Sequence, residues 1–269
     1  MKLPFQMDLS GKVAVVTGAG GVLCSVMAEA LAMCGAKVAL LDRSKESAME
    51  KADGIVKKGY VAKGYEANVL DKESLKATHE EILKDFGTCD ILINGAGGNS
   101  PLATTDKEYF ELGDIDAETK TFFDLEQSGV EFVFNLNFLG TLLPTQEFAK
   151  DMVEKEHASI LNIASMNAYT PLTKIPAYSG AKAAISNFTQ WLAVHFSRVG
   201  IRVNAIAPGF ILTDMTLALP EETRAEMIKM IPMRRCGEAE EVAKVALFLA
   251  SDLSSYVSGQ VLGVNGAMG

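Results

Sequence analysis

The stretch Thr17-Gly18-Ala19-Gly20-Gly21-Val22-Leu23-Cys24 is the strongest indication of how this chain folds, because it separates two patterns of different period. Before it, Lys12–Thr17 is a short run rich in β-branched residues. After it, Ser25–Gly35 repeats apolar residues at helical spacing, and Ala36–Leu41 is a second strand-like run. A strand, a glycine-rich turn, a helix and a second strand make the unit from which doubly wound α/β proteins are built.

The same alternation continues to the end of the chain. Runs of strand character follow at Tyr60–Ala67, Ile91–Asn94, Ala158–Ala164, Arg202–Ala207 and Val261–Val264. Helical patterns fall at Ser44–Lys58, Lys72–Phe86, Phe132–Glu154, Ala177–Val199 and Ala239–Ala250. Strands that alternate with helices pair in parallel through right-handed crossovers. We therefore predict an α/β fold with a doubly wound, Rossmann-type parallel sheet. One domain over residues 1–269 is expected, since such domains often reach roughly 250 residues.

Composition limits the class of partner. The net charge is −9, from 25 basic and 34 acidic residues without a basic stripe, so nucleic acid is excluded as a main partner. No apolar run approaches the roughly 18 residues that span a bilayer. Met1–Gly11 carries no apolar leader segment, so we expect a cytoplasmic protein without a membrane partner. The four cysteines and three histidines show no paired ligand spacing, which argues against a metal site.

The glycine-rich turn has the features of a dinucleotide site. Glycines let the backbone approach a pyrophosphate, and the start of the following helix supplies N–H donors. Asp42 ends the second strand-like run, where a carboxylate can bind ribose hydroxyls and repel a 2′-phosphate, although Arg43 beside it partly offsets this repulsion. The alternative role for Asp42 is a helix N-cap. We expect NAD, with NADP as the alternative. The cofactor candidates here are Gly18, Gly20, Gly21, Val22, Leu23, Asp42 and Arg43, together with Asn94, Gly95 and Ala96 after the fourth strand.

A second set of residues resembles the short-chain dehydrogenase/reductase family over essentially the whole chain. Tyr178 follows Ser165 by thirteen positions and begins Tyr178-Ser179-Gly180-Ala181-Lys182, which matches the family's Ser…Tyr-x-x-x-Lys signature. Asn137 matches the family's helix asparagine. The resemblance implies a nicotinamide-dependent oxidoreductase with Asn137, Ser165, Tyr178 and Lys182 as catalytic residues. It also implies cofactor contacts from Asn68, Val69, Tyr178, Lys182, Pro208, Gly209, Ile211 and Thr213.

The spacing of the signature makes chemical sense. Tyr178 and Lys182 stand at i and i+4 and therefore share one helix face. An unperturbed phenol has a pKa of about 10, and a nearby ammonium should lower that pKa. We therefore expect Tyr178 to give a proton to a carbonyl oxygen that Ser165 holds. The resemblance further implies that Lys182 holds the nicotinamide ribose and that Asn137 holds a water linking Lys182 to solvent.

Two places depart from the family's pattern. In a gapless register its second and third glycines fall on Val22 and Cys24, so we expect a reshaped turn. Near the C-terminus, Val264-Asn265-Gly266-Ala267 replaces the commoner Asp-Gly-Gly. Both differences indicate a distinct subgroup.

Two long segments leave the sheet at its ligand-binding edge. Asn99–Gly129 is a polar, acidic insertion, and Ile211–Arg235 is a lid-like segment that follows the sixth strand. Long connections at this edge are often lids, so we expect both to be more mobile without ligand, with Gly209 as a hinge. The alternative for Asn99–Gly129 is a fixed insertion at a subunit contact.

The substrate is suggested by a finer resemblance. Phe122-Phe123-Asp124-Leu125 and the stretch 132–146 resemble the fructuronate reductase (D-mannonate oxidoreductase) subgroup, which implies interconversion of D-fructuronate and D-mannonate. A sugar acid requires a cation for its carboxylate, and Lys174 is the first candidate, ahead of Arg234 and Arg235. The substrate candidates are Asn99, Ser100, Ser165, Asn167, Lys174 and Tyr178.

Other functions are compatible with the same residues. A gluconate or polyol dehydrogenase, or a 3-oxoacyl-carrier-protein reductase, would share the catalytic four, although the last would need a basic docking patch that is not visible. A non-catalytic NAD-sensing protein could use the same fold, but the presence of Tyr178 and Lys182 argues against it. The resemblance also implies a homotetramer paired through Phe132–Glu154 and Ala177–Val199, unless their apolar residues are simply core.

Overall fold

A computed structural model describes residues 7–170 and 174–268, so the first six residues of Met1–Gly11 lie outside the described residues. Seven strands form one sheet in the order β3-β2-β1-β4-β5-β6-β7, and every neighbouring pair is parallel. The predicted doubly wound sheet is therefore confirmed. The strands are β1 (Val13–Thr17), β2 (Lys37–Asp42), β3 (Ala62–Glu66), β4 (Ile91–Asn94), β5 (Ser159–Ile163), β6 (Arg202–Pro208) and β7 (Val261–Val264).

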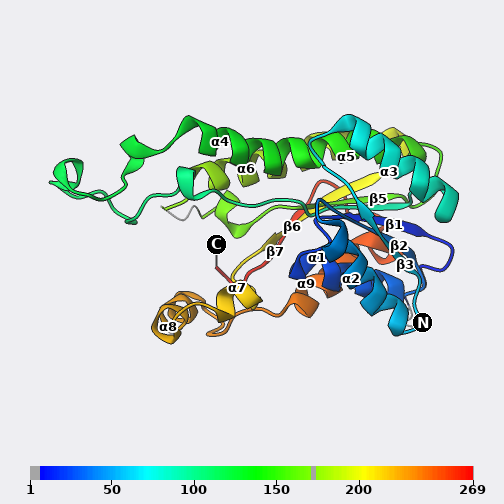
Figure 1. Ribbon diagram of the computed structural model, residues 1–269. Helices are drawn as coiled ribbons and strands as arrows, with labels where there is room; N and C mark the ends of the chain where they lie inside the picture. The colour runs from blue at the N-terminus through cyan, green and yellow to red at the C-terminus, as the bar shows by residue number, and fades with distance from the viewer. Residues whose placement is uncertain (1–6, 171–173, 269) are drawn as a thin grey trace.

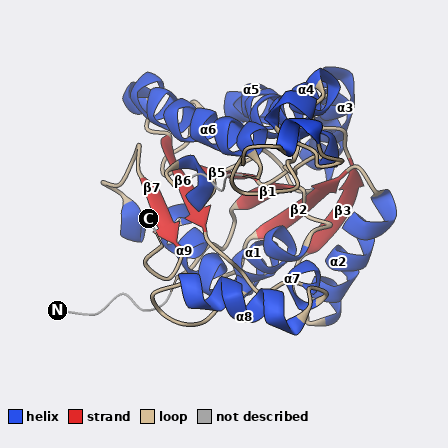
Figure 2. Cartoon of the chain, turned by 90° about the vertical axis from the view of Figure 1, so that its left-hand side faces the viewer, coloured by secondary structure: helices blue, strands red, loops and turns tan. Residues whose placement is uncertain are grey.

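Helices cover both faces of the sheet (Figures 1 and 2). Helices α1, α2 and α9 lie on one face, and α3, α4, α5 and α6 lie on the other. Two further helices, α7 and α8, lie beyond the carboxyl end of β6. The bounds are α1 (Val22–Met33), α2 (Lys45–Lys57), α3 (Lys72–Asp85), α4 (Gln127–Phe134), α5 (Gly140–Met152), α6 (Pro176–His195), α7 (Asp214–Leu217), α8 (Glu221–Met230) and α9 (Ala239–Ala250).

The hydrophobic core consists of two layers separated by the sheet. The central strands are mostly apolar and are buried along their length, as expected when helices cover both faces of a parallel sheet. On one face Met27 and Leu31 of α1 pack with Leu249 of α9. On the other face Phe148 and Met152 of α5 lie in the same cluster as strand residues. This packing fixes the carboxyl ends of the strands, where the glycine-rich turn begins.

The longest predicted helix is interrupted. The sequence predicts one helix over Phe132–Glu154, whereas the structure has α4, a π-helical turn at Asn135–Leu139, and α5. Within this turn the Asn137 amide donates to the Val133 carbonyl at 2.7 Å, a side-chain contact that replaces a regular backbone bond. At the other long helix, α6 ends at His195, and Ser197–Val199 forms a separate 3₁₀ turn.

Residues 99–126, which we call the arm, project beyond the body of the molecule at the carboxyl edge of the sheet (Figure 1). The arm has its own internal contacts: Lys107 pairs with the buried Asp114 at 2.7 Å, and Thr121 and Asp124 form a capping box. Its two ends meet, since the Glu126 N–H donates to the Leu102 carbonyl at 3.0 Å. The insertion is thus shorter than predicted, because α4 begins at Gln127.

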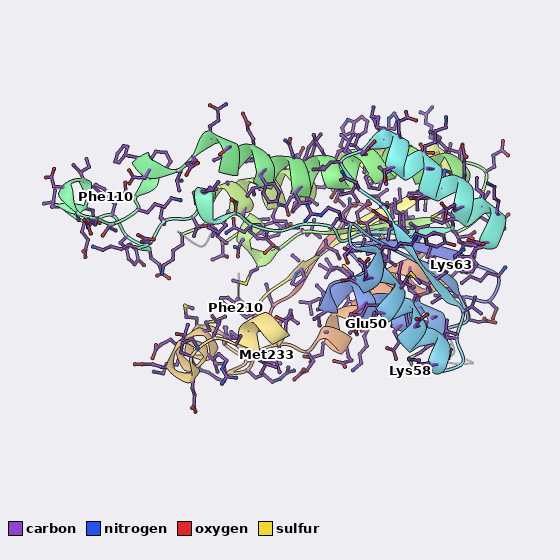
Figure 3. All side chains as sticks on the ribbon, viewed as in Figure 1. Glu50, Lys58, Lys63, Phe110, Phe210 and Met233 are labelled. Carbon is purple, nitrogen blue, oxygen red and sulfur yellow. The ribbon has the colours of Figure 1, made fainter. Side chains whose placement is uncertain are left out.

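Residues 211–235, which we call the α7–α8 segment, leave the same edge of the sheet (Figure 1). The sequence patterns predict no helix between Ala177–Val199 and Ala239–Ala250, whereas the structure has α7 and α8 there. Pro220 stands at the N-cap of α8, where proline is tolerated. Figure 3 labels Phe110 at the outer end of the arm and Phe210 and Met233 at the base of the α7–α8 segment.

Candidate active site

The glycine-rich turn joins β1 to α1 with backbone that only small residues permit. Gly18 has a φ of +67°, and a Cβ added there would lie 2.9 Å from the Ala96 backbone. Gly21 is the N-cap of α1 and supplies no side-chain cap. The first N–H groups of α1 are therefore left for a ligand, and the positive end of the helix dipole favours an anion there.

A cavity of about 630 Å³ lies over this turn. It follows the carboxyl ends of β3, β2, β1, β4 and β5, which are neighbours in the sheet. This is where open α/β sheets bind ligands, and the groups present fit a dinucleotide: a carboxylate, free helix N–H groups and glycine backbone in one row. The lining residues are Gly18, Gly21, Val22, Leu23, Cys24, Asp42, Arg43, Ala67, Asn68, Val69, Leu70, Gly95, Ala96, Gly97, Phe132, Leu136, Ile163 and Thr213.

Asp42 is held in place by the turn that it faces. Its Oδ2 accepts from the Gly20 N–H at 3.0 Å, and its Oδ1 accepts from the Ser44 N–H at 3.0 Å. Ser44, rather than Asp42, is the N-cap of α2. A Cβ on Gly20 would lie 2.9 Å from the carboxylate, so glycine is required at that position. The two backbone bonds leave further lone pairs on the carboxylate toward the cavity.

The four residues of the dehydrogenase signature come from three elements. Ser165 follows β5, Asn137 lies in the π turn, and Tyr178 and Lys182 lie on α6. The Lys182 ammonium donates to the Ile163 carbonyl at 2.8 Å and lies 5.5 Å from the centroid of the Tyr178 ring. All four side chains thus lie beside the carboxyl ends of β4 and β5.

Burial dominates the protonation of this cluster. It lowers the pKa of Lys182 to about 8, because the ammonium has lost its hydration. Burial also raises the pKa of Tyr178, and a hydrogen bond with Ser165 only partly opposes this shift. Our expectation that a nearby ammonium lowers the phenol pKa is therefore wrong for this structure. The reason is geometric: Lys182 lies near the face of the tyrosine ring, and desolvation of the phenol has the larger effect.

Asn137 is fully buried and closes the site from the side of the π turn. Its Nδ2 donates to the carbonyls of Gly98 and Val133, both at 2.7 Å, and its Oδ1 accepts from the Gly98 N–H at 3.3 Å. Both amide protons are thus engaged with the backbone. A Cβ on Gly97 would lie 2.6 Å from this Oδ1 and 3.2 Å from Lys182 Nζ, so Gly97 lies directly over both side chains.

Not every cofactor candidate from the sequence lines the cavity. The cofactor candidates outside its lining are Gly20, Asn94, Tyr178, Lys182, Pro208, Gly209 and Ile211. Asn94 is buried and donates to Thr145 and Asn162, which makes it a link between β4, α5 and β5. Gly209 packs against Asn265, whose Cα would lie 2.7 Å from an added Cβ.

The cavity also has lining residues that are not among the candidates predicted from the sequence. Phe132 and Leu136 stand at i and i+4 and face the cavity together, a spacing that could have identified them. Cys24 belongs to the glycine-rich turn, and Gly97 follows Ala96 after β4. The others are Ala67, Leu70 and Ile163.

The proposed substrate residues differ in their accessibility. Asn167 is buried beside Ser165, whose Oγ accepts its N–H at 3.2 Å. Asn99 is exposed and donates to Thr104 within the arm, while the Ser100 hydroxyl caps a short turn there. Lys174 is exposed, and its carbonyl accepts the Thr105 N–H at 2.9 Å, which ties the arm to the segment before α6.

The two arginines of the α7–α8 segment are already engaged. Arg235 forms a bidentate pair with Glu241, at 2.7 Å for each nitrogen. Arg234 donates to the Lys229 carbonyl. In the described residues there is no group of three histidine, cysteine or acidic side chains that could hold a metal ion. No helix in that part of the chain is both long and apolar enough to cross a membrane.

Comparison with known proteins gives the chain close relatives. A family model described as enoyl-(acyl carrier protein) reductase matches residues 21–268. An oxidoreductase of Haemophilus influenzae, described as uncharacterized, is 55% identical over 99% of this chain and 96% of its own length. The uncharacterized oxidoreductase UxuB of Bacillus subtilis is 44% identical, with coverages of 98% and 97%. The 3-oxoacyl-[acyl-carrier-protein] reductase FabG of Aquifex aeolicus is 38% identical, with coverages of 98% and 99%.

A solved structure resembles this one closely. It is a crystal structure from Haemophilus influenza with bound NAD, of a protein provisionally described as a D-mannonate oxidoreductase. The TM-score is 0.92 and the sequence identity is 56%, over 96% of this chain and 95% of that chain.

Proposed function

The chain belongs to the short-chain dehydrogenase/reductase family, and on this premise we propose that it reduces D-fructuronate to D-mannonate with NADH and catalyses the reverse oxidation with NAD. The observation that carries the proposal is the cavity along the strand ends, which runs over Gly97 with Lys182 and Asn137 directly beneath it. A dinucleotide in that cavity would bring its reactive end to the signature residues.

We assign each signature residue a separate task. When bound, NADH supplies a hydride to the carbonyl carbon of the substrate. The Tyr178 hydroxyl gives its proton to the carbonyl oxygen, and Ser165 holds that oxygen by a hydrogen bond. Because burial raises the pKa of Tyr178, the phenol keeps its proton at neutral pH, which is the form that reduction requires. Lys182 binds the nicotinamide ribose and returns a proton to Tyr178, and Asn137 fixes the backbone over Lys182.

The cofactor preference is assigned to Asp42. Its carboxylate lines the cavity at the end of β2, at the place where the family binds the adenosine ribose. A 2′-phosphate there would meet a fixed negative charge, while ribose hydroxyls could donate to it. Arg43 lines the same part of the cavity and offsets the repulsion only in part. NAD is therefore the proposed cofactor.

A sugar-acid substrate is favoured over the alternatives because the chain has a higher sequence identity to a relative described with that activity than to the carrier-protein reductases. The relative provisionally described as a D-mannonate oxidoreductase is 56% identical, whereas FabG of Aquifex aeolicus is 38% identical. The buried Asn167 beside Ser165 offers a polar contact for a hydroxylated substrate. Lys174 is the proposed carboxylate partner. A gluconate or polyol dehydrogenase and a 3-oxoacyl-carrier-protein reductase remain the competing activities.

Turnover with a substrate panel tests the proposal. The purified chain would be assayed with NADH or NADPH and D-fructuronate, 5-keto-D-gluconate or an acetoacetyl thioester, with Tyr178→Phe as the inactive control. We expect kcat/KM for D-fructuronate with NADH to exceed the others by at least about tenfold, since groups that bind a hydroxyl or carboxylate discriminate strongly against analogues that lack it. Preference for the thioester would favour a carrier-protein reductase. NADH binding without turnover of any ketone would favour a binding protein.

We also propose a homotetramer that pairs through α4, α5 and α6. Trp191 and Val194 on α6 are 56% and 77% exposed, although both are apolar. The Trp191 ring stacks on the rings of His195 and Phe188, with centroid separations of 4.6 and 6.2 Å, and the three rings form a flat stripe on α6. A second copy would bury it. Light scattering at micromolar concentration should give the tetramer mass, and a monomer would contradict the pairing.

The α7–α8 segment and the arm are proposed to close over substrate to different degrees. No residue of α8 is buried, and Met230 and Met233 are 52% and 59% exposed. The arm, in contrast, is braced by its Lys107–Asp114 pair. Residues 211–235 should therefore gain more protection in amide hydrogen exchange with NAD and mannonate together than with NAD alone, while the arm changes less. Equal exchange of residues 211–235 in both states would contradict a lid.

A further inference from the structure

Cys24 stands where the family's motif has its third glycine. The space that its side chain needs is left free by Gly95, which has no side chain. Cys24 lies in the first turn of α1, is 5% exposed and lines the cofactor cavity. A Cβ built on Gly95 would lie 2.2 Å from Cys24 Sγ, a distance that no pair of real side chains adopts. The same point lies 3.6 Å from Cys24 Cβ, which is ordinary contact. The sulfur atom therefore occupies the space of the missing side chain at residue 95.

Residues of the glycine-rich turn hold the backbone of Gly95 and Ala96 in place. Thr17 Oγ1 accepts from the N–H groups of Gly95 and Ala96, at 3.1 and 3.3 Å. The backbone of Ala96 lies against Gly18, where an added Cβ would approach within 2.9 Å. Cys24 and Thr17 thus support the Gly95–Ala96 backbone together.

The other end of this turn meets the catalytic residues. Gly97 lies over Asn137 Oδ1 and Lys182 Nζ, and the Gly98 backbone bonds to Asn137 in both directions. Only Ala96 therefore lies between Gly95, which Cys24 supports, and Gly97, which lies over Asn137. Any shift of Gly95 changes the wall of the cavity and reaches the residues beneath it.

We propose that Cys24 is a positioning residue for the cofactor: its sulfur and the absent side chain of Gly95 form a matched pair that sets the position of the Gly95–Gly97 backbone. The inference rests on the proposed function, because this backbone lines the cavity assigned to NAD. Burial raises the pKa of the Cys24 thiol to about 12, so the thiol stays neutral and acts through its volume rather than as a nucleophile.

A double-mutant cycle tests the pairing. NADH affinity would be measured by fluorescence titration for the native chain, Cys24→Ala, Gly95→Ala and the double variant, with melting temperatures for all four. Cys34→Ala serves as the matched cysteine control. Gly54→Ala serves as the reference glycine substitution, because Gly54 lies on α2 and its new Cβ would have nothing within 4 Å. These titrations need no sugar substrate.

We expect Gly95→Ala to weaken NADH binding at least about tenfold in the native chain and by no more than about threefold in the Cys24→Ala background, a coupling typical of residues in contact. The remaining loss reflects the Thr17 carbonyl oxygen, 2.9 Å from the same Cβ in both backgrounds. If Gly95→Ala folds only when Cys24→Ala is also present, the pairing is supported as well.

Three results would overturn the inference. The first is an equal loss of affinity in both backgrounds. The second is failure of both Gly95→Ala chains to fold, since the Thr17 carbonyl would then set the requirement for glycine. The third is a lower melting temperature of Cys24→Ala with no coupling in NADH affinity, which would make Cys24 a packing residue only. Absence of NADH binding by the native chain would instead refute the proposed function.

Discussion

His79 and Lys182 are both buried titratable side chains in the layer of helices α3–α6, but their surroundings are opposite. His79 on α3 lies between Glu147 Oε1 and Asp151 Oδ2 of α5, each 2.9 Å from a ring nitrogen. Lys182 donates to a backbone carbonyl, and within residues 7–170 and 174–268 no carboxylate lies within ion-pair distance of it.

The difference separates a structural site from a chemical one. Glu147 also accepts from Lys150 at 2.7 Å, and Asp151 also accepts the Cys89 N–H at 2.9 Å. Both carboxylates beside His79 therefore have further partners. The charge on Lys182 is desolvated without a counter-ion, which costs stability and makes its proton easy to lose. A buried charge without a partner is the stronger indication of function.

Replacement of His79 is the most severe way to test this contrast. His79→Ala removes the partner that two half-buried carboxylates share, so we expect a loss of about 3 kcal/mol in the free energy of unfolding, the lower end of the range for a broken buried pair. Activity per folded molecule should stay normal below the melting temperature. Urea unfolding measures the loss, with the exposed His157→Asn as the matched control, since asparagine tolerates the positive φ at that position. Unchanged stability would show that the cluster around His79 is not structural.

Tyr178→Phe tests the chemical side of the contrast. It removes one hydroxyl, and we expect kcat to fall at least about 10²-fold with NADH affinity nearly unchanged, the usual scale for a lost proton donor. Because the pKa of Tyr178 is raised, the rate of mannonate oxidation by the native chain should climb as pH rises, since oxidation needs the phenolate. The fully exposed Tyr256→Phe is the control. Normal turnover of Tyr178→Phe would remove the assignment.

Lys182→Met should separate activity from stability. The shift in the pKa of Lys182 from 10.5 to about 8 corresponds to about 3 kcal/mol, of which roughly 1 kcal/mol is offset by the lost bond to the Ile163 carbonyl. The folded pKa is lowered, so this cost is complete below pH 8 and disappears as pH rises to 10.5. The variant should be inactive, more stable than the native chain at pH 7, and lose that advantage at high pH. A variant less stable at pH 7 would contradict this.

Asp42 has both a structural role in the glycine-rich turn and a proposed role in cofactor binding. We expect its replacement to have the smallest effect of the four substitutions. Asp42→Ala removes a carboxylate that fixes the turn through Gly20 and faces the cavity. Discrimination between NADH and NADPH, measured as the ratio of kcat/KM values, should fall by about tenfold, in line with the loss of one charge contact. If the native chain already prefers NADPH, the role given to Asp42 is wrong.

Sequence patterns predict the sheet well, because their periods follow from burial. All seven strands and α9 lie where the sequence predicts them, since long apolar runs leave few alternatives. The π turn at Asn135–Leu139 has no such signal. It depends on Asn137 reaching Gly98, which is distant in sequence. For the same reason the motif located Tyr178 and Lys182 but gave the wrong direction for the tyrosine pKa.

The residues around the cavity could also be predicted only in part, because some of their contacts join distant parts of the sequence. The glycines of the turn could be recognised, but the fit of Cys24 against Gly95 is a contact between residues 71 positions apart. No local pattern encodes it. Asn94 shows the converse: its place after a strand suggested a cofactor contact, whereas its amide links three elements of the core.

The meeting of the arm's two ends has a consequence for how this enzyme could have diverged. Because Glu126 bonds to Leu102, the backbone enters and leaves the arm at nearly one point. A single insertion or deletion of the intervening codons would leave β4 and α4 where they are. A single genetic event could therefore replace the arm and change the substrate range, while the residues that carry out hydride transfer are inherited unchanged.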